Sequence, residues 1–340
     1  MKSTADTSKR QKIRSMWEEK LINFLQSRQS DGLHALYEKE MRDNITSKRF
    51  LVILALIVVT SLVSLYGAVQ GLSDATSNEY MFLAIYTTSG NSIPSFMSFI
   101  ALLGPFVGIV LGFDAITGEK SDRTLYRLAT QPIYRDSIIN GKFLAGMSII
   151  FMMVYAMGAF LGAAGILALG IRPTSEEVWR VIVFLFFTAV YISFWLALSL
   201  WLSVVSKNAA ASAMTAIGIW LFFSLFMTMV AQMIANVVYP MTTELEVYRN
   251  QLGNYQLDLT LNRISPYYLY SEAVSTIMNP SVRSVSVITM ESLSGAISSY
   301  LSLGQSLLLV WPHLAGLIAL MLISFAGSYI CFMRQEIRAK

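Results

Sequence analysis

Six long apolar stretches constrain what this chain can fold into. They lie at about residues 50–72, 93–113, 143–169, 178–205, 209–238 and 307–333. A helix needs about 20 apolar residues to cross the hydrocarbon layer of a bilayer, and in lipid only a helix or a closed barrel satisfies every backbone polar group. Charged residues make up 14% of the chain, against about 25% in a typical soluble domain. The sequence therefore predicts an all-α, polytopic membrane protein with six transmembrane helices.

The lysines and arginines predict how these helices are oriented. Of the 25 basic residues, 20 lie in the two ends of the chain and in the loops after the second and fourth stretches. Basic residues are retained on the cytoplasmic side of a membrane, so both termini are expected in the cytoplasm. The other five basic residues lie on the opposite side or at a span edge, which leaves the predicted span interiors without basic residues. Ionisable groups at mid-membrane commonly mark proton or ion paths, so an ion-driven carrier is disfavoured.

The segments outside the six stretches divide into two groups. Residues 1–49 contain two amphipathic helical patterns, of which the second has Leu33, Leu36 and Met41 on one face. Such helices can lie in the membrane interface or pack on their own protein, and the first could instead contact a partner. The remaining chain, 50–340, holds the six spans. Within it, 239–306 is expected on the outer side, with helices at 242–262 and 267–278, as a folded cap or a re-entrant gate.

Several kinds of chemistry have no support in the residues. There is no Walker A motif, because Gly141-Lys142 has Asp136 where the first glycine should stand and Phe143 where Ser or Thr should follow. The single cysteine, Cys331, lies in an apolar stretch, and His313 is expected to be packed or interfacial. We predict no catalytic, cofactor-binding or metal-binding residue in this chain. The energy for any work must therefore come from elsewhere.

The loop 114–142 is the most informative polar segment. Ser121 or Asp122 could cap a short helix, Pro132 would end it, and Asp136 could start the helix that leads into the third span. This pattern predicts a helix-turn-helix that could serve as a docking element on the cytoplasmic side. An ordinary basic loop remains the alternative.

The same loop carries a family resemblance. It contains Thr117-Gly118-Glu119-Lys120, then Arg123-Thr124-Leu125 with Leu128, then Pro132 with Arg135, and it ends in Gly141-Lys142. This order resembles the signature of type-2 ABC transporter permeases, although Arg123 stands where the family has Gly and Tyr134 where it has Ser. The stretch from Tyr37 to Phe50 looks like the connecting helix of that family. The resemblance covers about 31–340, and the branch it looks most like includes permeases of nitrous-oxide-reductase copper maturation and of gliding motility.

The resemblance implies an assembly and a set of contact residues. Two permease chains, identical or different, would associate with two ABC ATPase subunits, which bind the ATP. The 114–142 loop would be the coupling helix, with ATPase-coupling residues Glu119, Arg123, Thr124, Leu125, Arg127, Leu128, Pro132, Ile133 and Arg135. The connecting helix would contribute Tyr37, Glu40, Met41 and Arg42.

The expected function is that of a multi-pass permease in the plasma membrane, and a prokaryotic inner membrane fits the resemblance. The complex would export a substrate, using ATP hydrolysed by the partner, with lipid around it and no role for nucleic acid. A membrane scaffold, a subunit that transmits mechanical work, and a secondary carrier are the alternatives.

Overall fold

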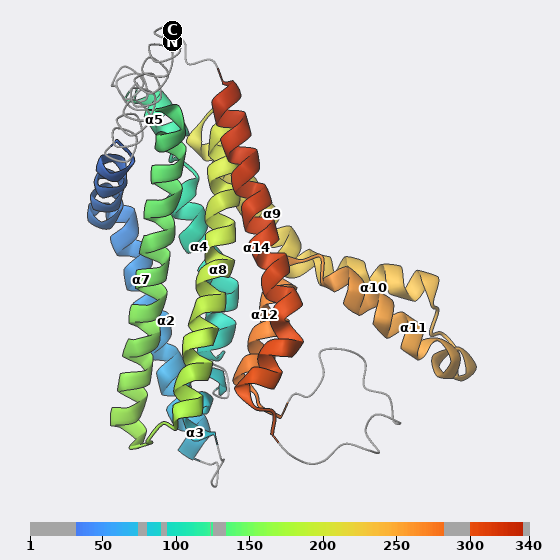
Figure 1. Cartoon of the computed structure of the whole chain (residues 1–340). Coiled ribbons are helices and arrows are strands. Elements are labelled where there is room, and N and C mark those ends of the chain that lie inside the picture. Colours follow the sequence, from blue (N-terminus) through green and yellow to red (C-terminus); the bar gives the residue numbers. More distant parts are fainter. Residues whose placement is uncertain are drawn as a thin grey trace, which may run out of the picture.

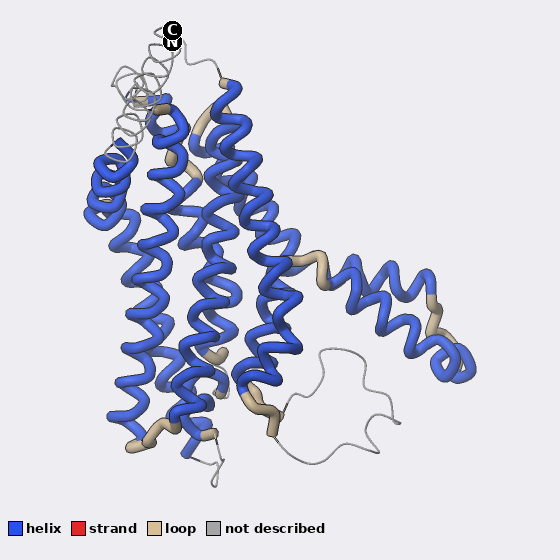
Figure 2. Tube along the Cα trace, in the orientation of Figure 1, coloured by secondary structure: helices blue, strands red, loops and turns tan. Residues whose placement is uncertain are grey.

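The computed structural model describes residues 32–73, 80–89, 94–122, 124, 134–281 and 300–335. This part of the chain is helical and contains no strand (Figures 1 and 2). A first helix covers 32–46. It is followed by α2 (Lys48–Ser73), α3 (Met81–Thr87), α4 (Phe96–Gly112), α5 (Thr117–Ser121), α7 (Arg135–Leu169), α8 (Ser175–Val205), α9 (Ala209–Leu221), the π-helical turn η1 (Phe222–Phe226), α10 (Met227–Val238), α11 (Glu244–Asn262), α12 (Pro266–Met278) and α14 (Leu303–Arg334).

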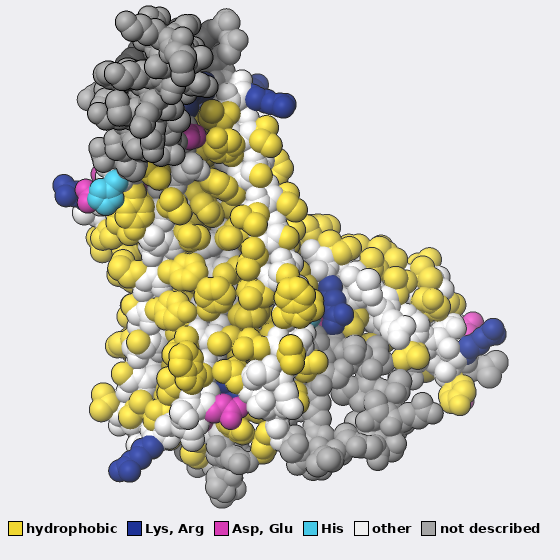
Figure 3. Space-filling view, viewed as in Figure 1, with side chains coloured by type: hydrophobic (Ala, Val, Ile, Leu, Met, Phe, Trp, Pro, Cys, Tyr) yellow, Lys and Arg dark blue, Asp and Glu magenta, His cyan; other side chains and the backbone are white. Residues whose placement is uncertain are grey.

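Six helical segments within the described ranges are long and apolar enough to cross a membrane, as the sequence predicts. The third begins at Arg135 and the sixth at Leu303, so both are longer than the predicted stretches. Figure 3 shows hydrophobic side chains covering the flank of the bundle, with charged groups toward its two ends and on the projecting part. We call the two ends the α5 end and the α3 end after the helices that lie there (Figure 1).

The centre of the bundle is α8, which packs against α4, α7, α12 and α14. Three glycines at four-residue spacing on α4 make the contact with α8 close. A Cβ atom added at Gly108 would lie 2.5 Å from the carbonyl oxygen of Ile192, and one at Gly104 or Gly112 would also meet α8. Small residues at this spacing let transmembrane helices approach backbone to backbone. The spacing is visible in the sequence, but our sequence interpretation did not use it.

The predicted fifth span, 209–238, does not stay in the bundle along its whole length. The chain follows the bundle as α9, turns at η1, and then leaves it as α10, which folds back on α11 (Figure 1). A π-helical turn is a recognised cause of a helix kink. The chain re-enters the bundle as α12, which packs against α14, α8 and α4.

The position of α12 bears on the segment predicted to lie outside the spans. The Thr188 hydroxyl of α8 and the Tyr270 hydroxyl of α12 are 2.8 Å apart, and the Tyr270 ring stacks on Tyr191. Both tyrosines are fully buried. Helix α12 therefore lies inside the bundle, as in the re-entrant alternative, and not above it as a cap.

The interior of the bundle contains a carboxylate that lies outside the six predicted spans. Glu272 of α12 lies 2.7 Å from Nε2 of His313 on α14, and it accepts two hydrogen bonds of 2.9 Å from Arg263. The sequence interpretation assigned Glu272 to the outer segment, and so it missed the partner of His313. Glu272 thus pairs with both His313 and Arg263, as a buried charge requires.

The α3 end is held together by a second buried charge, Arg180 of α8. Its guanidinium donates to the carbonyl oxygens of Ile277 and Leu301, each at 2.6 Å, and pairs with Glu176. The side chain is fully buried. Arg180 thus ties the end of α12 and the approach to α14 onto α8.

Candidate functional site

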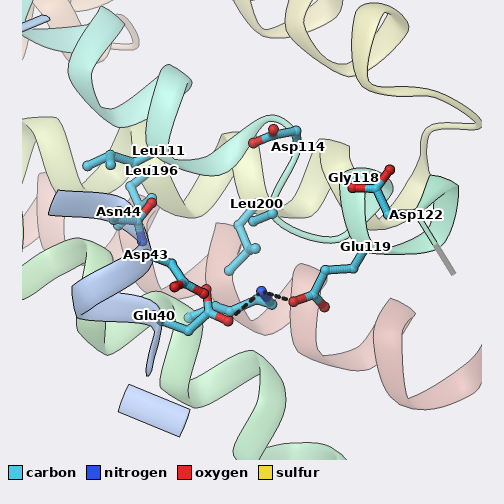
Figure 4. A pocket seen from close by; sticks show the side chains of 12 residues that line it. Glu40, Asp43, Asn44, Leu111, Asp114, Gly118, Glu119, Asp122, Leu196 and Leu200 are labelled. Carbon is cyan, nitrogen blue, oxygen red and sulfur yellow. Dashed lines mark hydrogen bonds and ion pairs between the residues drawn. The ribbon is translucent and has the colours of Figure 1, made fainter. Parts of the chain in front are cut away.

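The candidate site is a junction at the α5 end where the 32–46 helix, α5 and α7 meet. Lys142 of α7 lies between two carboxylates, with its Nζ atom 2.9 Å from Oε1 of Glu40 and 2.8 Å from Oε1 of Glu119. Figure 4 shows the two glutamates turned toward the amine, with both interactions dashed. Lys39 adds a second cation, 2.9 Å from Glu40 and 3.6 Å from Glu119. A single buried lysine therefore joins three elements that are far apart in sequence.

The local sequence explains why these elements come so close. Gly141 precedes Lys142, and a Cβ atom added to it would lie 3.2 Å from Cβ of Leu36 on the 32–46 helix. Leu36 is buried in this contact. The absence of a side chain at Gly141 thus allows the helices to touch, and the next residue supplies the charge that pairs across the contact.

The start of α5 is held by α8. The Ser203 hydroxyl accepts hydrogen bonds from the backbone N–H groups of Ile116 and Thr117, at 3.0 and 3.1 Å. These N–H groups lie at the helix N-terminus, where no partner exists within the helix itself. Ser203 is fully buried, so it fixes α5 in the same way as a capping residue, although it comes from another helix.

Two further contacts close the α5 end. Lys120 of α5 donates to the Val204 carbonyl oxygen at 3.1 Å and to Gln335 at 2.8 Å. Arg49, at the start of α2, pairs with Asp114 and lies over the Phe113 ring. Helix α5 is therefore bonded to α8 and to the end of α14, and the turn before it is bonded to α2.

A cavity of about 330 Å³ lies beside the junction (Figure 4). Its lining contains the carboxylates Glu40, Asp43, Asp114, Glu119 and Asp122, together with Lys142. The Oε2 atom of Glu119 is buried and has no hydrogen-bond partner within the described residues. No group of three side chains suited to a metal ion was found in the described ranges. The cavity is acidic overall, and Asp122, the C-cap of α5, belongs to its lining.

Glu40 gives the junction a defined pH dependence. Burial alone would raise the pKa of Glu40, but Lys142 and Lys39 more than offset this, and the pKa lies below its ordinary value of 4.5. A depressed carboxyl pKa stabilises the folded state above the ordinary pKa, and this contribution is lost as the pH falls through the lower, folded-state pKa. We therefore expect the melting temperature of the parent protein to fall below about pH 4.5 more steeply than that of Glu40→Gln. Thermal unfolding in lipid nanodiscs between pH 7 and 3 measures this, and parallel curves would contradict it.

The structure describes only some of the residues predicted for coupling. Glu119 lies in the junction, Thr124 is half-buried, and its hydroxyl lies 3.4 Å from the Glu119 carbonyl oxygen. Arg135 donates to the carbonyl oxygens of Phe332 and Gln335 at the end of α14, so it is engaged by its own chain. The others, Arg123, Leu125, Arg127, Leu128, Pro132 and Ile133, lie outside the described residues.

The four connecting-helix residues divide between the buried and exposed faces of the 32–46 helix. Glu40 is buried, Tyr37 and Met41 are half-buried, and Arg42 is exposed. The sequence interpretation placed Glu40 on this helix, but without its partner Lys142, which it used only as the end of the loop motif. Nothing in the sequence marks Ser203 as the residue that caps α5.

The limits predicted for the loop helices are partly confirmed. Helix α7 begins at Arg135 and has Asp136 in its first turn. The predicted start at Asp136 is therefore correct to within one residue. Asp122 follows the end of α5 as its C-cap, and α5 itself starts earlier, at Thr117, where Ser203 of α8 supplies the cap. The next helix, which Ser121 or Asp122 was expected to cap, lies almost wholly outside the described residues, so that cap stays a prediction.

The chain resembles known proteins over most of its length. A family model described as ABC-2 family transporter protein matches residues 34–337. A protein of Pseudomonas aeruginosa named "Probable ABC transporter permease protein NosY" is 28% identical over 191 residues, which are 55% of this chain and 65% of that protein. A protein of the same name from Stutzerimonas stutzeri is 27% identical over 193 residues, 56% of this chain and 66% of that protein. The chain thus aligns with slightly less than two thirds of the length of these relatives.

Proposed function

The chain belongs to the ABC-2 family of transporter proteins, and on that premise we propose that it works as the permease of an exporter whose ATP is hydrolysed by separate ATPase subunits. It is a multi-pass membrane protein with six apolar helices, and its matched relatives are bacterial, which places it in a prokaryotic inner membrane. In the proposed complex two permease chains associate with two ATPase subunits at the α5 end, which would face the cytoplasm.

The observation that carries this proposal is the Lys142 junction. The segment that follows α5 is the predicted contact with the ATPase, and α5 is bonded to α7 through Glu119, to α8 through Ser203 and to α14 through Gln335. A displacement of this segment would therefore act on three spans and on the 32–46 helix together. A partner shifts a conformational equilibrium only if its contacts differ between the two states. A change in the contacts between the ATPase and the segment after α5 would be transmitted to the bundle through this network.

The rest of the bundle agrees with an energy source outside the chain. The ionisable groups inside it, Glu272 with His313 and Arg263, and Arg180 with Glu176, are paired within the bundle. These pairs join α12 to α14 and to α8. This is a structural role, and the proposed ATP-driven mechanism requires no more of them than this.

The test is purification of the full chain from its native membrane in mild detergent, followed by mass spectrometry of the proteins that accompany it. We expect a stoichiometric protein that carries Walker motifs. The charge reversal Arg123→Glu with Arg127→Glu should remove it, whereas Arg172→Glu, an exposed arginine at the α3 end, should not. A chain that purifies only with itself, under conditions that preserve a known transporter complex, would favour the scaffold or the carrier.

The direction of transport needs a separate experiment. Inside-out vesicles that contain the complex should accumulate a substrate supplied outside them when ATP is added, because their cytoplasmic side faces the medium. Metabolite profiling of the growth medium, compared between cells with and without the chain, would supply candidate substrates. A complex that hydrolyses ATP at the normal rate but moves no compound would favour the mechanical alternative.

A further inference from the structure

Helices α10 and α11 form a hairpin, here called the arm, that projects sideways from the bundle (Figure 1). The two helices pack mainly on each other. The Asn254 side chain donates to Asn236 Oδ1 and to the Tyr239 carbonyl oxygen, both at 2.9 Å. A Cβ atom at Gly253 would lie 2.9 Å from the Tyr239 ring. The arm is therefore a tightly packed unit with its own internal bonds.

The base of the arm is fixed to the bundle. Arg263, directly after α11, pairs with Glu272 of α12, which in turn contacts His313 of α14. The Ser265 hydroxyl donates to the Phe223 carbonyl oxygen of η1 at 2.7 Å, so the two chain segments that enter and leave the arm are joined. These bonds set the direction in which the arm projects.

The depth of the base follows from α12. Tyr270 bonds to Thr188, which is 13 residues from the start of the 31-residue helix α8. At 1.5 Å per residue α8 is about 46 Å long, so Thr188 lies near its midpoint, and a hydrocarbon layer about 30 Å thick that α8 crosses includes that midpoint. The arm therefore leaves the bundle at a level within the hydrocarbon layer.

Helix α10 exposes apolar side chains such as Met229, Met233 and Val237, but one face of α11 does not suit lipid at this depth. Helix α11 exposes Glu244, Arg249 and Gln251 to the surroundings, and charged or amide groups facing lipid within the membrane are costly. Tyr248, Gln251 and Tyr255 follow one another at helical spacing, and Tyr248 and Tyr255 are 91% and 51% exposed. Tyrosine is enriched at protein interfaces. A protein surface, and not lipid, is the expected neighbour of this face.

We propose that the arm docks on a second copy of this chain, with the Tyr248–Gln251–Tyr255 face in the contact. The inference rests on the proposed dimeric transporter and adds the element that joins its two permeases. Twofold symmetry brings the same surface patch of both copies together. Phenol and amide groups both donate and accept hydrogen bonds. This face of one copy can therefore bond to the same face of the other copy, whereas two faces that carry charges of the same sign would repel each other. Such polar contacts hold helices together in membranes.

The test places a photo-crosslinking analogue of phenylalanine at position 248 in the full chain, in native membranes with its complex. We expect a product of twice the chain mass, whose crosslink joins two copies of this chain. The control carries the same analogue at Leu167 of α7, which is 87% exposed, and should yield no such product. A crosslink from position 248 to a different protein, or to lipid alone, would overturn the proposal.

A second variant measures the strength of the contact without the crosslinker. Tyr248→Ala with Tyr255→Ala should raise the dissociation constant of the permease dimer in lipid by at least about tenfold, since tyrosines in the centre of an interface commonly contribute most of its binding energy. Single-molecule photobleaching at graded protein densities gives this constant, and Leu167→Ala is the control. An unchanged constant would overturn the proposal.

The two proposals can fail separately. An ATPase that co-purifies with two permease chains, without a crosslink at position 248, would refute the arm contact and leave the transporter proposal standing. A crosslinked pair that carries no ATPase would refute the transporter proposal and support the arm contact.

Discussion

Replacement of Lys142 by methionine is expected to destabilise the protein by about 3–5 kcal/mol, because removal of one partner from a buried ion pair leaves the other charge uncompensated. Here two carboxylates, Glu40 and Glu119, would both lose the amine that lies within 3 Å of each of them. The two carboxylates would then repel each other with only the partly exposed Lys39 beside them, and the contact between the 32–46 helix and α5 would weaken. The melting temperature of the purified chain in nanodiscs measures the loss.

The same variant tests coupling when it is examined in the complex. If the junction transmits the action of the ATPase, Lys142→Met should lower the substrate-stimulated ATPase rate more than the basal rate. The matched control is the triple variant Lys142→Met, Glu40→Gln, Glu119→Gln, which removes the charges together. A buried ion pair can often be replaced by neutral groups at little cost, so the triple variant should recover most of the stability but not the coupling. A single variant with the melting temperature and stimulation of the parent would show that the junction has neither role.

The six helices were predictable because their signal is local and strong. A run of about 20 apolar residues needs a helix in lipid whatever its neighbours are, so the existence and order of the spans followed directly from the sequence. The path of the fifth stretch did not. Residues 209–238 are apolar enough for one membrane span, and hydropathy cannot show that α10 leaves the bundle at η1 while the less apolar α12 packs beside α8.

The candidate site was predictable to a similar extent. The loop motif and the connecting helix were both found, and Glu40, Glu119 and Lys142 all occur in the motifs that were quoted. Their meeting depends on the packing of Gly141 against Leu36, which brings together residues about 100 positions apart in sequence. Ser203 is different, because a serine near the end of an apolar helix carries no signal that it caps α5. A single sequence states neither of these pairings.

The glycines of α4 offer the second large effect, and they can be tested by adding one methyl group. Gly108→Ala should destabilise the protein by about 1–3 kcal/mol, the usual cost of overpacking a well-packed interior. The added Cβ would lie 2.5 Å from the Ile192 carbonyl oxygen and 2.7 Å from the Leu196 amide nitrogen. Because both atoms belong to the backbone of α8, no side chain can rotate to make room, and the two helices must separate.

Gly218 of α9 is the matched control, because a Cβ atom there would meet nothing within 4 Å. Alanine is the better helix former by about 1 kcal/mol, so Gly218→Ala should be neutral or stabilising. The two variants make the same chemical change in two transmembrane helices, and thermal unfolding in nanodiscs compares them directly. Equal melting temperatures would mean that α4 and α8 tolerate separation. A lower melting temperature for Gly108→Ala alone would show that the backbone contact between α4 and α8 holds the central helices together. Because α5 follows α4 in the chain, this contact would also help to position the junction.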